Sequence, residues 1–393
     1  MGAVNSVCII DPGMTQSFGH HYTYNHAFAR AYREAGLPVR FFFNERTPGK
    51  LLDEYPDSIA CFAWGLYQKP DAARLSEEKF QSSATALCTE LQQHIQPQLN
   101  AASLVFAHTL DPTGLLGFAL WYTALEEQQR PHLAVNLMLG VDGTPQCRAR
   151  LNAACSLLRH CAKAQIFGGT QATGELLSAL MGRVCAMLPT PLPKSPESYH
   201  QQTCPEYPIF GLVGDWRLGK NLQILPSALM RYLIKGGQGS FTIQMTPTDE
   251  QIAPVVLALH DLGHHFPGKV SLDIRYLDER AYYQNLASLT ALIIPYTAES
   301  YSRYRPSGLV IESAAMAVPA ICLQGGFMQE ELAPLQNGSL FMPKPTVECL
   351  VEALFLFERE MWDRKALALA VAPNYILYHD IQRLLDLFVE KRA

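Results

Sequence analysis

The sequence is poor in charge and lacks the patterns that mark several classes of protein. Only 17% of its 393 residues are charged and 48% are hydrophobic, against roughly 25% charged residues in typical globular domains, which excludes a disordered or coiled-coil chain. The 31 Lys and Arg and 36 Asp and Glu residues give a net charge of −5. No stretch concentrates Lys and Arg, so the basic surface of a nucleic-acid-binding protein is missing. We therefore expect small molecules or glycans as partners, and no nucleic acid.

Cysteine motifs, a leader and long apolar runs are also missing. The ten cysteines form no C-x-x-C pair, which favours reduced, buried thiols over disulfides or zinc ligation. The first residues lack a basic segment and a cleavage site, so we expect no secretory signal and a cytoplasmic location. The most apolar predicted helix, 113–125, is shorter than the ~20 residues of a membrane span. Peripheral association with the inner face of a membrane stays open.

Short runs rich in Val, Ile and Phe alternate with helical patterns along the whole chain. Strands separated by helices indicate parallel βαβ units, because parallel strands need a crossover connection. The strands predicted in the first half are 6–10, 39–43, 104–107, 133–137, 164–167 and 184–188. Those predicted in the second half are 209–213, 240–245, 270–275, 291–295, 320–323 and 339–342. The fold class is therefore α/β, with two Rossmann-like doubly wound parallel sheets.

Prolines interrupt this alternation between residues 189 and 208, where six of them occur. Proline lacks an N–H group and restricts the residue before it, so this stretch continues neither a sheet nor a helix. We predict a first domain at 1–190, a linker at 191–208 and a second domain at 209–372. The end of the chain, 373–393, carries a predicted amphipathic helix at 376–391 that we expect to pack back on the first domain. Ligands should bind at the carboxyl ends of the strands.

The first candidate loop, 214–221, follows the strand 209–213 and opens a helix. Arg217 and Lys220 place two cations where the amides of a helix start attract anions, and Asn221 is a suitable N-cap. A guanidinium fork and an ammonium group together suit a diphosphate. The alternative is an ordinary loop whose cations face water.

The second candidate loop follows the strand 291–295. Because Pro306 forces Arg305 out of the α region, the next helix must start near Ser307, and Gly308 leaves its first amides accessible. Glu312 is an isolated acid on an otherwise apolar helix, and a buried carboxylate needs a partner. Ribose hydroxyls would supply one; the alternative is a salt bridge to Arg or Lys.

A glycine pair and three histidines complete the candidates. Gly325 and Gly326 follow the strand 320–323 and permit close backbone approach to a sugar or phosphate, although a plain tight turn has the same pattern. Four residues of the first half stand at the end of a predicted strand or near the start of a predicted helix: Gly19, His20, His21 and His108. They would contact the acceptor or the donor sugar; the alternative is that they cap a helix or pack in the core.

Together the three loops resemble the donor-binding half of GT-B glycosyltransferases, and in particular family 4 (glycosyltransferases group 1). Residues 214–221 resemble the family's G-x-x-R-x-x-K-[GN] loop, and residues 307–321 its S-G-x-x-x-E-A-x-x-x-G-x-P-x-I signature. Tyr304 stands where the family commonly has the first of two glutamates, which contacts the donor sugar. Ser313 and Val318 replace the usual alanine and glycine. The first half is similar in layout alone.

The resemblance implies two domains facing a cleft and transfer of a sugar from a nucleoside-diphosphate sugar to a hydroxyl of a glycan, a lipid-linked or another acceptor. It also implies retention of configuration, no cofactor and no essential metal, and the sequence contains no D-x-D. Arg217 and Lys220 would be catalytic by stabilising the leaving diphosphate. The donor-binding residues would be Asn221, Tyr304, Arg305, Ser307, Gly308, Glu312, Gly325 and Gly326. The alternatives are a nucleotide-sugar 2-epimerase on the same fold and a non-catalytic binding or partner subunit.

Overall fold

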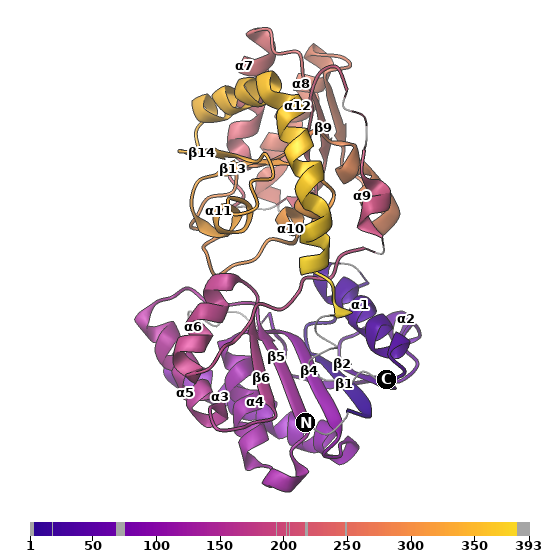
Figure 1. Ribbon diagram of the computed structural model, residues 1–393, viewed down its shortest axis with the longest axis vertical. Helices are drawn as coiled ribbons and strands as arrows, with labels where there is room; N and C mark the ends of the chain where they lie inside the picture. Colours follow the sequence, from indigo (N-terminus) through magenta and orange to yellow (C-terminus); the bar gives the residue numbers. More distant parts are fainter. Residues whose placement is uncertain are drawn as a thin grey trace. The chain divides into compact units, whose positions relative to one another are not determined.

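The computed structural model describes residues 4–17, 19–67, 75–193, 195–201, 203, 205–216, 219–247 and 250–382. It divides into two compact units (Figure 1). The first unit holds the described residues of Met1–Pro191, Tyr304–Pro306 and Asp380–Ala393. The second unit holds those of Leu192–Arg303 and Ser307–His379.

The first unit is built on a six-stranded parallel sheet with the strand order β3-β2-β1-β4-β5-β6. Its strands are β1 (Ser6–Asp11), β2 (Val39–Asn44), β3 (Ser58–Phe62), β4 (Ser103–Leu110), β5 (His132–Leu137) and β6 (Ala164–Gly168). Its α-helices are α1 (His20–Glu34), α2 (Gly49–Leu52), α3 (Glu77–Glu90), α4 (Pro112–Ala124), α5 (Pro145–Leu158) and α6 (Gln171–Met181).

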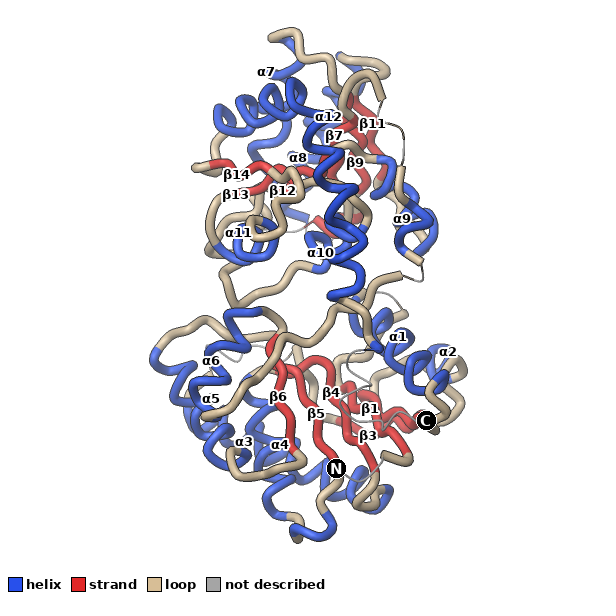
Figure 2. The backbone as a smooth tube through the Cα atoms, viewed as in Figure 1, coloured by secondary structure: helices blue, strands red, loops and turns tan. Residues whose placement is uncertain are grey.

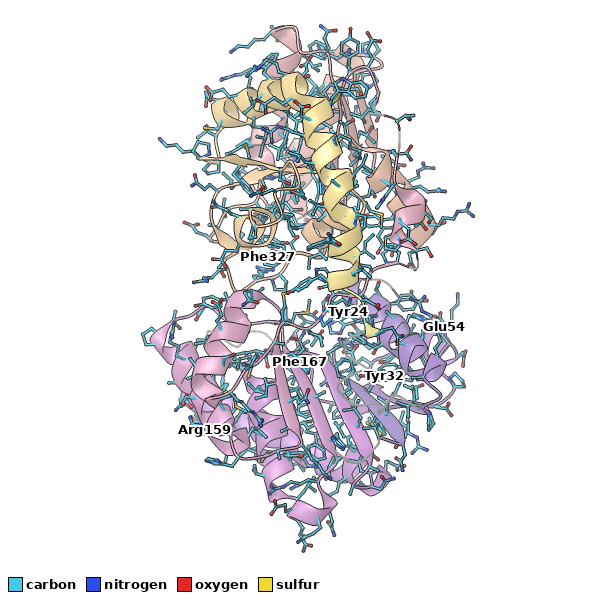
Figure 3. The ribbon with its side chains drawn as sticks, in the orientation of Figure 1. Tyr24, Tyr32, Glu54, Arg159, Phe167 and Phe327 are labelled. Atoms are coloured by element: carbon cyan, nitrogen blue, oxygen red, sulfur yellow. The ribbon has the colours of Figure 1, made fainter. Side chains whose placement is uncertain are left out.

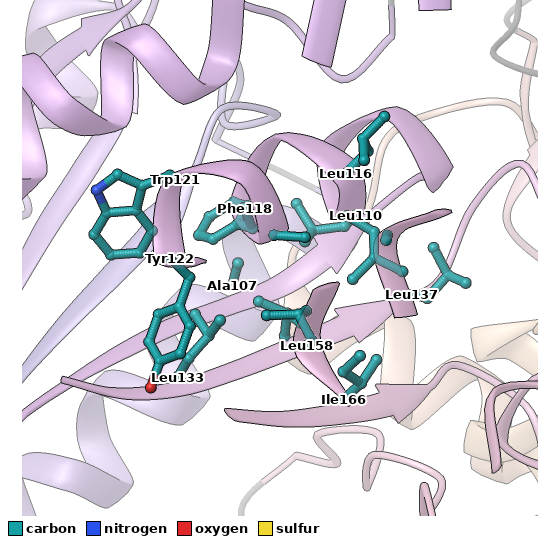
Figure 4. Packing of buried hydrophobic residues seen from close by; sticks show 14 of the residues in the cluster. Ala107, Leu110, Leu116, Phe118, Trp121, Tyr122, Leu133, Leu137, Leu158 and Ile166 are labelled. Atoms are coloured by element: carbon teal, nitrogen blue, oxygen red, sulfur yellow. The ribbon is translucent and has the colours of Figure 1, made fainter. Parts of the chain in front are cut away.

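Both faces of this sheet are buried, because successive side chains of a strand point to opposite faces. In β4, Val105 and Ala107 belong to a cluster that includes residues of α3, α4 and α5, and part of it is seen in Figure 4. The alternate residues Leu104 and Phe106 pack with α1, whose Tyr24 and Tyr32 are labelled in Figure 3. Two buried faces explain the high apolar fraction of the sequence.

The second unit repeats this plan with the strand order β11-β9-β7-β12-β13-β14, again with parallel pairs. Its main strands are β7 (Ile209–Leu212), β9 (Ser240–Gln244), β11 (Val270–Asp273), β12 (Ala291–Ile294), β13 (Ala320–Leu323) and β14 (Leu340–Met342). Its α-helices are α7 (Leu225–Ile234), α8 (Ala253–His265), α9 (Glu279–Ser288), α10 (Gly308–Ala315), α11 (Gly326–Leu332) and α12 (Val347–Tyr378). A small separate pair joins β8 (Asp215–Trp216) to β10 (Thr246–Pro247).

The structure corrects three of the predicted elements. Residues 184–188 form no strand; Met187 makes an isolated bridge to Gly168. The helix after β7 starts at Leu225, because a 3₁₀ turn, Leu222–Ile224, comes first. The third correction concerns α12, which passes through Pro373 as one helix to Tyr378 (Figure 2).

The remaining expectations concern the chain's end, its linker and its thiols. Most of the helix predicted at 376–391 lies outside the described residues; Ile381 is buried in the first unit. The proline-rich stretch contains a 3₁₀ turn, Pro196–Tyr199, and is part of the second unit from Leu192 onward. All nine described cysteines are free thiols. In the described part of the chain, no helix combines the length and the apolar character needed to cross a membrane.

Candidate functional site

Lys220 is the buried cation of the loop that follows β7. Its side chain is 6% exposed, and its Nζ donates hydrogen bonds to the backbone oxygen of Asp215 at 2.6 Å and to Asp215 Oδ1 at 2.8 Å. The same Nζ lies 5.0 Å from the centre of the Tyr296 ring. Burial by itself lowers the pKa of Lys220, but the neighbouring Tyr296 and Asp215 outweigh it and the pKa is raised. Lys220 is therefore a fixed positive charge.

The three candidate loops of the second unit meet at the carboxyl edge of its sheet. Gly219 adjoins the loop after β12, since a Cβ there would lie 3.0 Å from Ser300 Oγ. Tyr296 and Tyr301, both buried, stack with ring centres 4.8 Å apart. A Cβ at Gly326 would overlap the carbonyl oxygen of Tyr301. Together with the contact of Lys220 with Tyr296, these contacts join three loops that lie far apart in the sequence.

The other residues of the first loop differ from expectation. Asn221 precedes the 3₁₀ turn in a left-handed conformation with φ 54° and makes no capping hydrogen bond. Its side chain instead accepts a hydrogen bond from Gln223 and points its amide at the backbone oxygen of Pro345, 3.5 Å away. The prediction of an N-cap is wrong because the helix begins four residues later. Arg217 lies outside the described residues, so its catalytic role stays a prediction.

Helix α10 begins as the proline rule predicts, with Ser307 before it and Gly308 as its first residue. The Ser307 side chain makes no capping hydrogen bond, and a Cβ at Gly308 would meet nothing closer than Glu312 Oε1 at 3.9 Å. The backbone start of α10 is thus accessible, as expected for an anion site.

Within the protein, the partner of Glu312 is a tyrosine and not the Arg or Lys of the alternative; the contact with ribose hydroxyls stays a prediction. Its Oε2 accepts a hydrogen bond of 2.7 Å from the hydroxyl of Tyr282 in α9. Burial raises the pKa of Glu312, against the lowering effect of hydrogen bonds from Tyr282 and Tyr283. Burial also raises the pKa of Tyr282 well above its usual value, so this hydroxyl stays a donor. A carboxylate keeps further acceptor positions for other hydroxyls.

The structure explains why Gly325 and Gly326 are glycines and shows which residue replaces the glycine of the 307–321 signature. Gly325 (φ 87°) precedes α11, and its N–H donates to Gln329 Oε1 at 2.6 Å; Gly326 is required by the close Tyr301 carbonyl. The left-handed residue after α10 is Ala317, with φ 55°. Ala317 also lies five residues after Glu312, as the glycine does in the signature. The replaced glycine is therefore at Ala317, and its assignment to Val318 was wrong.

Tyr304 and Arg305 belong to the first unit, whereas Ser307, Gly308 and Glu312 belong to the second. Tyr304 is half-buried against the core of the first unit, and a Cβ at Gly143 would lie 2.6 Å from its ring. Arg305 is exposed. The donor-binding role of these two residues stays a prediction.

The candidate histidines of the first unit gather around a carboxylate at the end of β1. Asp11 is 1% exposed, and its Oδ1 accepts hydrogen bonds from His21 Nδ1 at 2.7 Å and from the N–H of Gly13 at 3.0 Å. Its Oδ2 accepts from Asn25 Nδ2 at 2.6 Å and lies 3.3 Å from His108 Nε2. Burial alone would raise the pKa of Asp11, but the two imidazoles hold it well below its usual value. Asp11 is therefore an anion.

Gly19 and His20 stand at the start of α1, beside this cluster. Gly19 precedes the helix with φ 80°, a conformation that favours glycine. His20 Nε2 lies 3.3 Å from the hydroxyl of Tyr67, which is also 2.8 Å from His21 Nε2. Burial lowers the pKa of His20 well below its usual value, so it is neutral.

The three side chains Asp11, His21 and His108 are of kinds that ligate metals, and they form the one such group among the described residues. Two ligands that each lie about 2.1 Å from a tetrahedral metal ion are about 3.4 Å apart. The His21 and Asp11 atoms are 2.7 Å apart, which is a hydrogen-bond distance. As it stands, the group is a hydrogen-bonded network.

Sequence reasoning missed Asp11, Asn25 and Tyr67. Asp11 could have been found, because an acid at the carboxyl end of a predicted strand, two residues before Gly13, stands at the edge where ligands bind. Glycine is needed at position 13, because a Cβ there would overlap the His21 ring. Asn25 and Tyr67 carry no local signal, since only the tertiary fold brings them to the histidines.

Two parallel α/β units of this kind define the GT-B fold of the glycosyltransferases, and solved structures with that fold match nearly the whole chain. An α,α-trehalose-phosphate synthase (UDP-forming) from Burkholderia vietnamiensis matches with a TM-score of 0.61 and 12% identity, over 97% of this chain and 99% of that chain. A sucrose-phosphate synthase from Thermosynechococcus elongatus gives 0.60 and 15%, over 97% and 99%. Anabaena Alr3699/HepE in complex with UDP-glucose gives 0.60 and 12%, over 97% and 98%. The predicted GT-B fold is confirmed.

At 12–15% identity these likenesses concern the fold. No protein-family model and no curated protein sequence matches the chain.

Proposed function

We propose that the protein transfers a sugar from a nucleoside-diphosphate sugar to the hydroxyl of an acceptor. The observation that carries the proposal is the buried Lys220 ammonium at the junction of three loops, on the carboxyl edge of the second sheet. The fold adds support, because the matching HepE structure holds UDP-glucose. UDP-glucose is therefore the first donor to test.

Lys220 would stabilise the diphosphate as it leaves the sugar. Negative charge develops on the leaving group in this reaction, and a preformed positive charge in a buried site is typically worth a few kcal/mol there. The accessible start of α10 would add its amides, and Arg217 a second cation. Glu312, held by Tyr282, would accept hydrogen bonds from the ribose. These charges replace the role that a metal ion has in other phosphate sites, so we propose a metal-independent reaction.

Two stereochemical courses are consistent with such a transfer. Retention, which the resemblance implies, lets the leaving diphosphate take the proton of the acceptor hydroxyl, and no base is required. Inversion by direct displacement requires a base that takes this proton. The acceptor would be a hydroxyl of a glycan or a lipid-linked molecule in either case.

A panel of nucleoside diphosphates tests the proposal. We expect at least one of UDP, GDP, ADP and TDP to raise the melting temperature in buffer containing EDTA. Lys220→Ala should remove this shift and weaken binding about 10- to 100-fold, since hydrogen bonds to charged groups are worth about 1.5–3 kcal/mol. Lys235→Ala, which changes an exposed lysine at the end of α7, is the matched control and should keep the shift. Absence of any shift with all four nucleotides contradicts the proposal.

A second candidate function is a nucleotide-sugar 2-epimerase, and the Asp11 network favours it because epimerisation needs acid and base groups. The two functions differ in their need for an acceptor. Incubation with UDP-GlcNAc alone gives the epimer if the protein is an epimerase; a transferase gives none. Binding of nucleotides without turnover in either assay would identify a non-catalytic subunit.

A further inference from the structure

The exposed side of helix α12 changes character along its length. Before Trp362, its exposed residues are all charged: Glu348, Glu352 and Arg359. From residue 366 to residue 378 the sequence contains no charged residue, although seven of these thirteen residues are exposed. A helix at the surface of a globular protein normally turns charged and polar residues to the solvent. The second half of α12 therefore exposes an apolar surface where the first half exposes charges.

The exposed apolar residues form one continuous line. Their spacing of four, four, three and four residues keeps them on one side of a helix with 3.6 residues per turn. We call them the α12 stripe: Trp362, Ala366, Ala370, Pro373 and Leu377. Trp362 is 59% exposed and Leu377 is 63% exposed. The α12 stripe thus has a large side chain at each end and two alanines between them.

The opposite side of α12 holds the helix on the second unit (Figure 1). Ala368 and Ala372 are buried against Ala317, which follows α10, and Tyr375 is buried in a cluster that includes residues of α10. The packing of α12 on its own unit therefore does not use the α12 stripe. The α12 stripe lies wholly within the second unit.

The area of this surface suits an interface between two chains. Leu367, 48% exposed, and Tyr378, 43% exposed, flank the α12 stripe. Since a large aromatic side chain has an area of about 150–250 Å², the exposed side chains add up to an area on the order of 500 Å². Two such surfaces facing each other would bury about 1,000 Å², the size at which specific interfaces begin.

The charges around the α12 stripe favour a second chain over a lipid surface. A helix that lies on a membrane flanks its apolar side with Lys and Arg. No exposed residue between 362 and 378 is Lys or Arg. The two cations of this segment are engaged within the unit: Arg364 binds Glu360, and the buried Lys365 donates to the carbonyl of Ala317.

We propose that a second copy of the chain docks on the α12 stripe, with the two helices antiparallel and a two-fold axis at Ala370. Such an axis places Trp362 of each chain opposite Leu377 of the partner subunit. The alanines meet in the middle, where small side chains allow a short distance between helix axes. A two-fold interface requires a surface that is its own complement, and the α12 stripe has this symmetry. The dimer goes beyond the proposed function and does not depend on it.

Sedimentation of the full chain tests the dimer. We expect twice the mass of one chain at about 50 µM, because interfaces of modest size reach micromolar dissociation constants. A monomer at this concentration overturns the proposal. A monomer that instead sediments with vesicles of phosphatidylcholine and phosphatidylglycerol also overturns it, since the occupant would then be a lipid surface.

A charge at the axis tests the location of the interface. Ala370→Glu sets two carboxylates face to face and should raise the dissociation constant of the dimer at least about 100-fold. The helical circular dichroism should be unchanged, because glutamate and alanine both suit an exposed helix position. Leu257→Glu is the matched control, since it changes a leucine of α8 that is 65% exposed, and the dimer should persist. A dimer that survives Ala370→Glu overturns the proposal.

Cysteine cross-linking tests the antiparallel arrangement. Ala370→Cys lies at the axis, so mild oxidation should join two chains by a disulfide, whereas the wild type should stay uncross-linked. Two copies of Ala366→Cys would be about 12 Å apart along the pair of helices, too far for a disulfide. Ala366→Cys mixed with Asn374→Cys should cross-link, because these positions face each other. Self-linking of Ala366→Cys as efficient as that of Ala370→Cys overturns the arrangement.

Discussion

At the scale of single residues, the left-handed Ala317 shows how a replaced glycine is tolerated. A non-glycine residue at positive φ costs roughly 1–2 kcal/mol, which should disfavour alanine at φ 55°. The Ala317 side chain, however, is fully buried against Ala368 and Ala372 of α12, and Lys365 Nζ donates to its carbonyl at 2.7 Å. Burial of the methyl group returns about 0.8 kcal/mol. Burial of the methyl group therefore offsets part of the strain.

Ala317→Gly is therefore expected to change the free energy of unfolding by less than about 0.5 kcal/mol, because relief of strain is offset by the lost methyl group and by the greater freedom of the unfolded chain, about 0.4–1 kcal/mol. Gln336→Gly is the matched comparison. Gln336 has φ 53° and is exposed, so no lost burial adds to the entropic cost of glycine, and we expect stabilisation of about 0.5–1 kcal/mol. Denaturant unfolding measures both. Equal stabilisation by the two substitutions would contradict the offset at Ala317.

At the scale of elements, the pair of α9 and α10 carries a carboxylate whose burial opposes folding at neutral pH. Because the pKa of Glu312 is raised by burial, the folded state binds its proton more readily than the unfolded state. The contribution to stability therefore falls as pH rises from the ordinary carboxylate pKa through the raised one. A charge kept at such a position is consistent with a binding role rather than a stabilising one.

At pH 7, Glu312→Gln should raise the melting temperature, because it removes a buried charge while the amide oxygen still accepts the hydrogen bond from Tyr282. The gain should vanish toward pH 4, where the carboxyl group of Glu312 is protonated in the folded protein. Glu348→Gln is the control of opposite sign. The backbone at the start of α12 and Arg231 hold the pKa of Glu348 below its usual value. The Glu348 carboxylate therefore stabilises the fold fully above the usual carboxylate pKa, and this effect is lost as the pH falls through the lowered pKa. Thermal melts between pH 4 and pH 8 measure both. A fall in melting temperature for Glu312→Gln at pH 7 would contradict the burial cost.

The elements also show what the sequence could predict. Eleven of the twelve predicted strands are present, because strands buried on both faces appear as plain apolar runs. The strand β3 was missed since it is an edge strand with half-exposed residues. The prediction of a strand at 184–188 was wrong because it rested on composition alone. In the second unit the loops were identifiable from glycine, proline and isolated charges, whereas the Asp11 network depends on β1, α1 and β4 meeting in space, which no local pattern records.

At the scale of the whole molecule, the two units share a plan but differ in their polar groups. Each has a six-stranded parallel sheet with its own hydrophobic clusters. The buried ammonium group that stands at the three candidate loops, Lys220, is in the second unit, and the buried anion Asp11 with its imidazoles is in the first. A diphosphate should therefore bind to the second unit.

Hydrogen exchange with UDP alone tests this division. We expect UDP to slow amide exchange around residues 219–224 and at the start of α10, because a bound ligand stabilises the states that hold it. The amides of β1 and β4 should exchange at unchanged rates, since the residues that we propose for the diphosphate and the ribose of UDP all lie in the second unit. Lys220→Ala should abolish the protection in the second unit, and Lys235→Ala should preserve it. Protection of β1 and β4 equal to that of α10 would contradict the assignment, because the binding of UDP would then not be confined to the second unit.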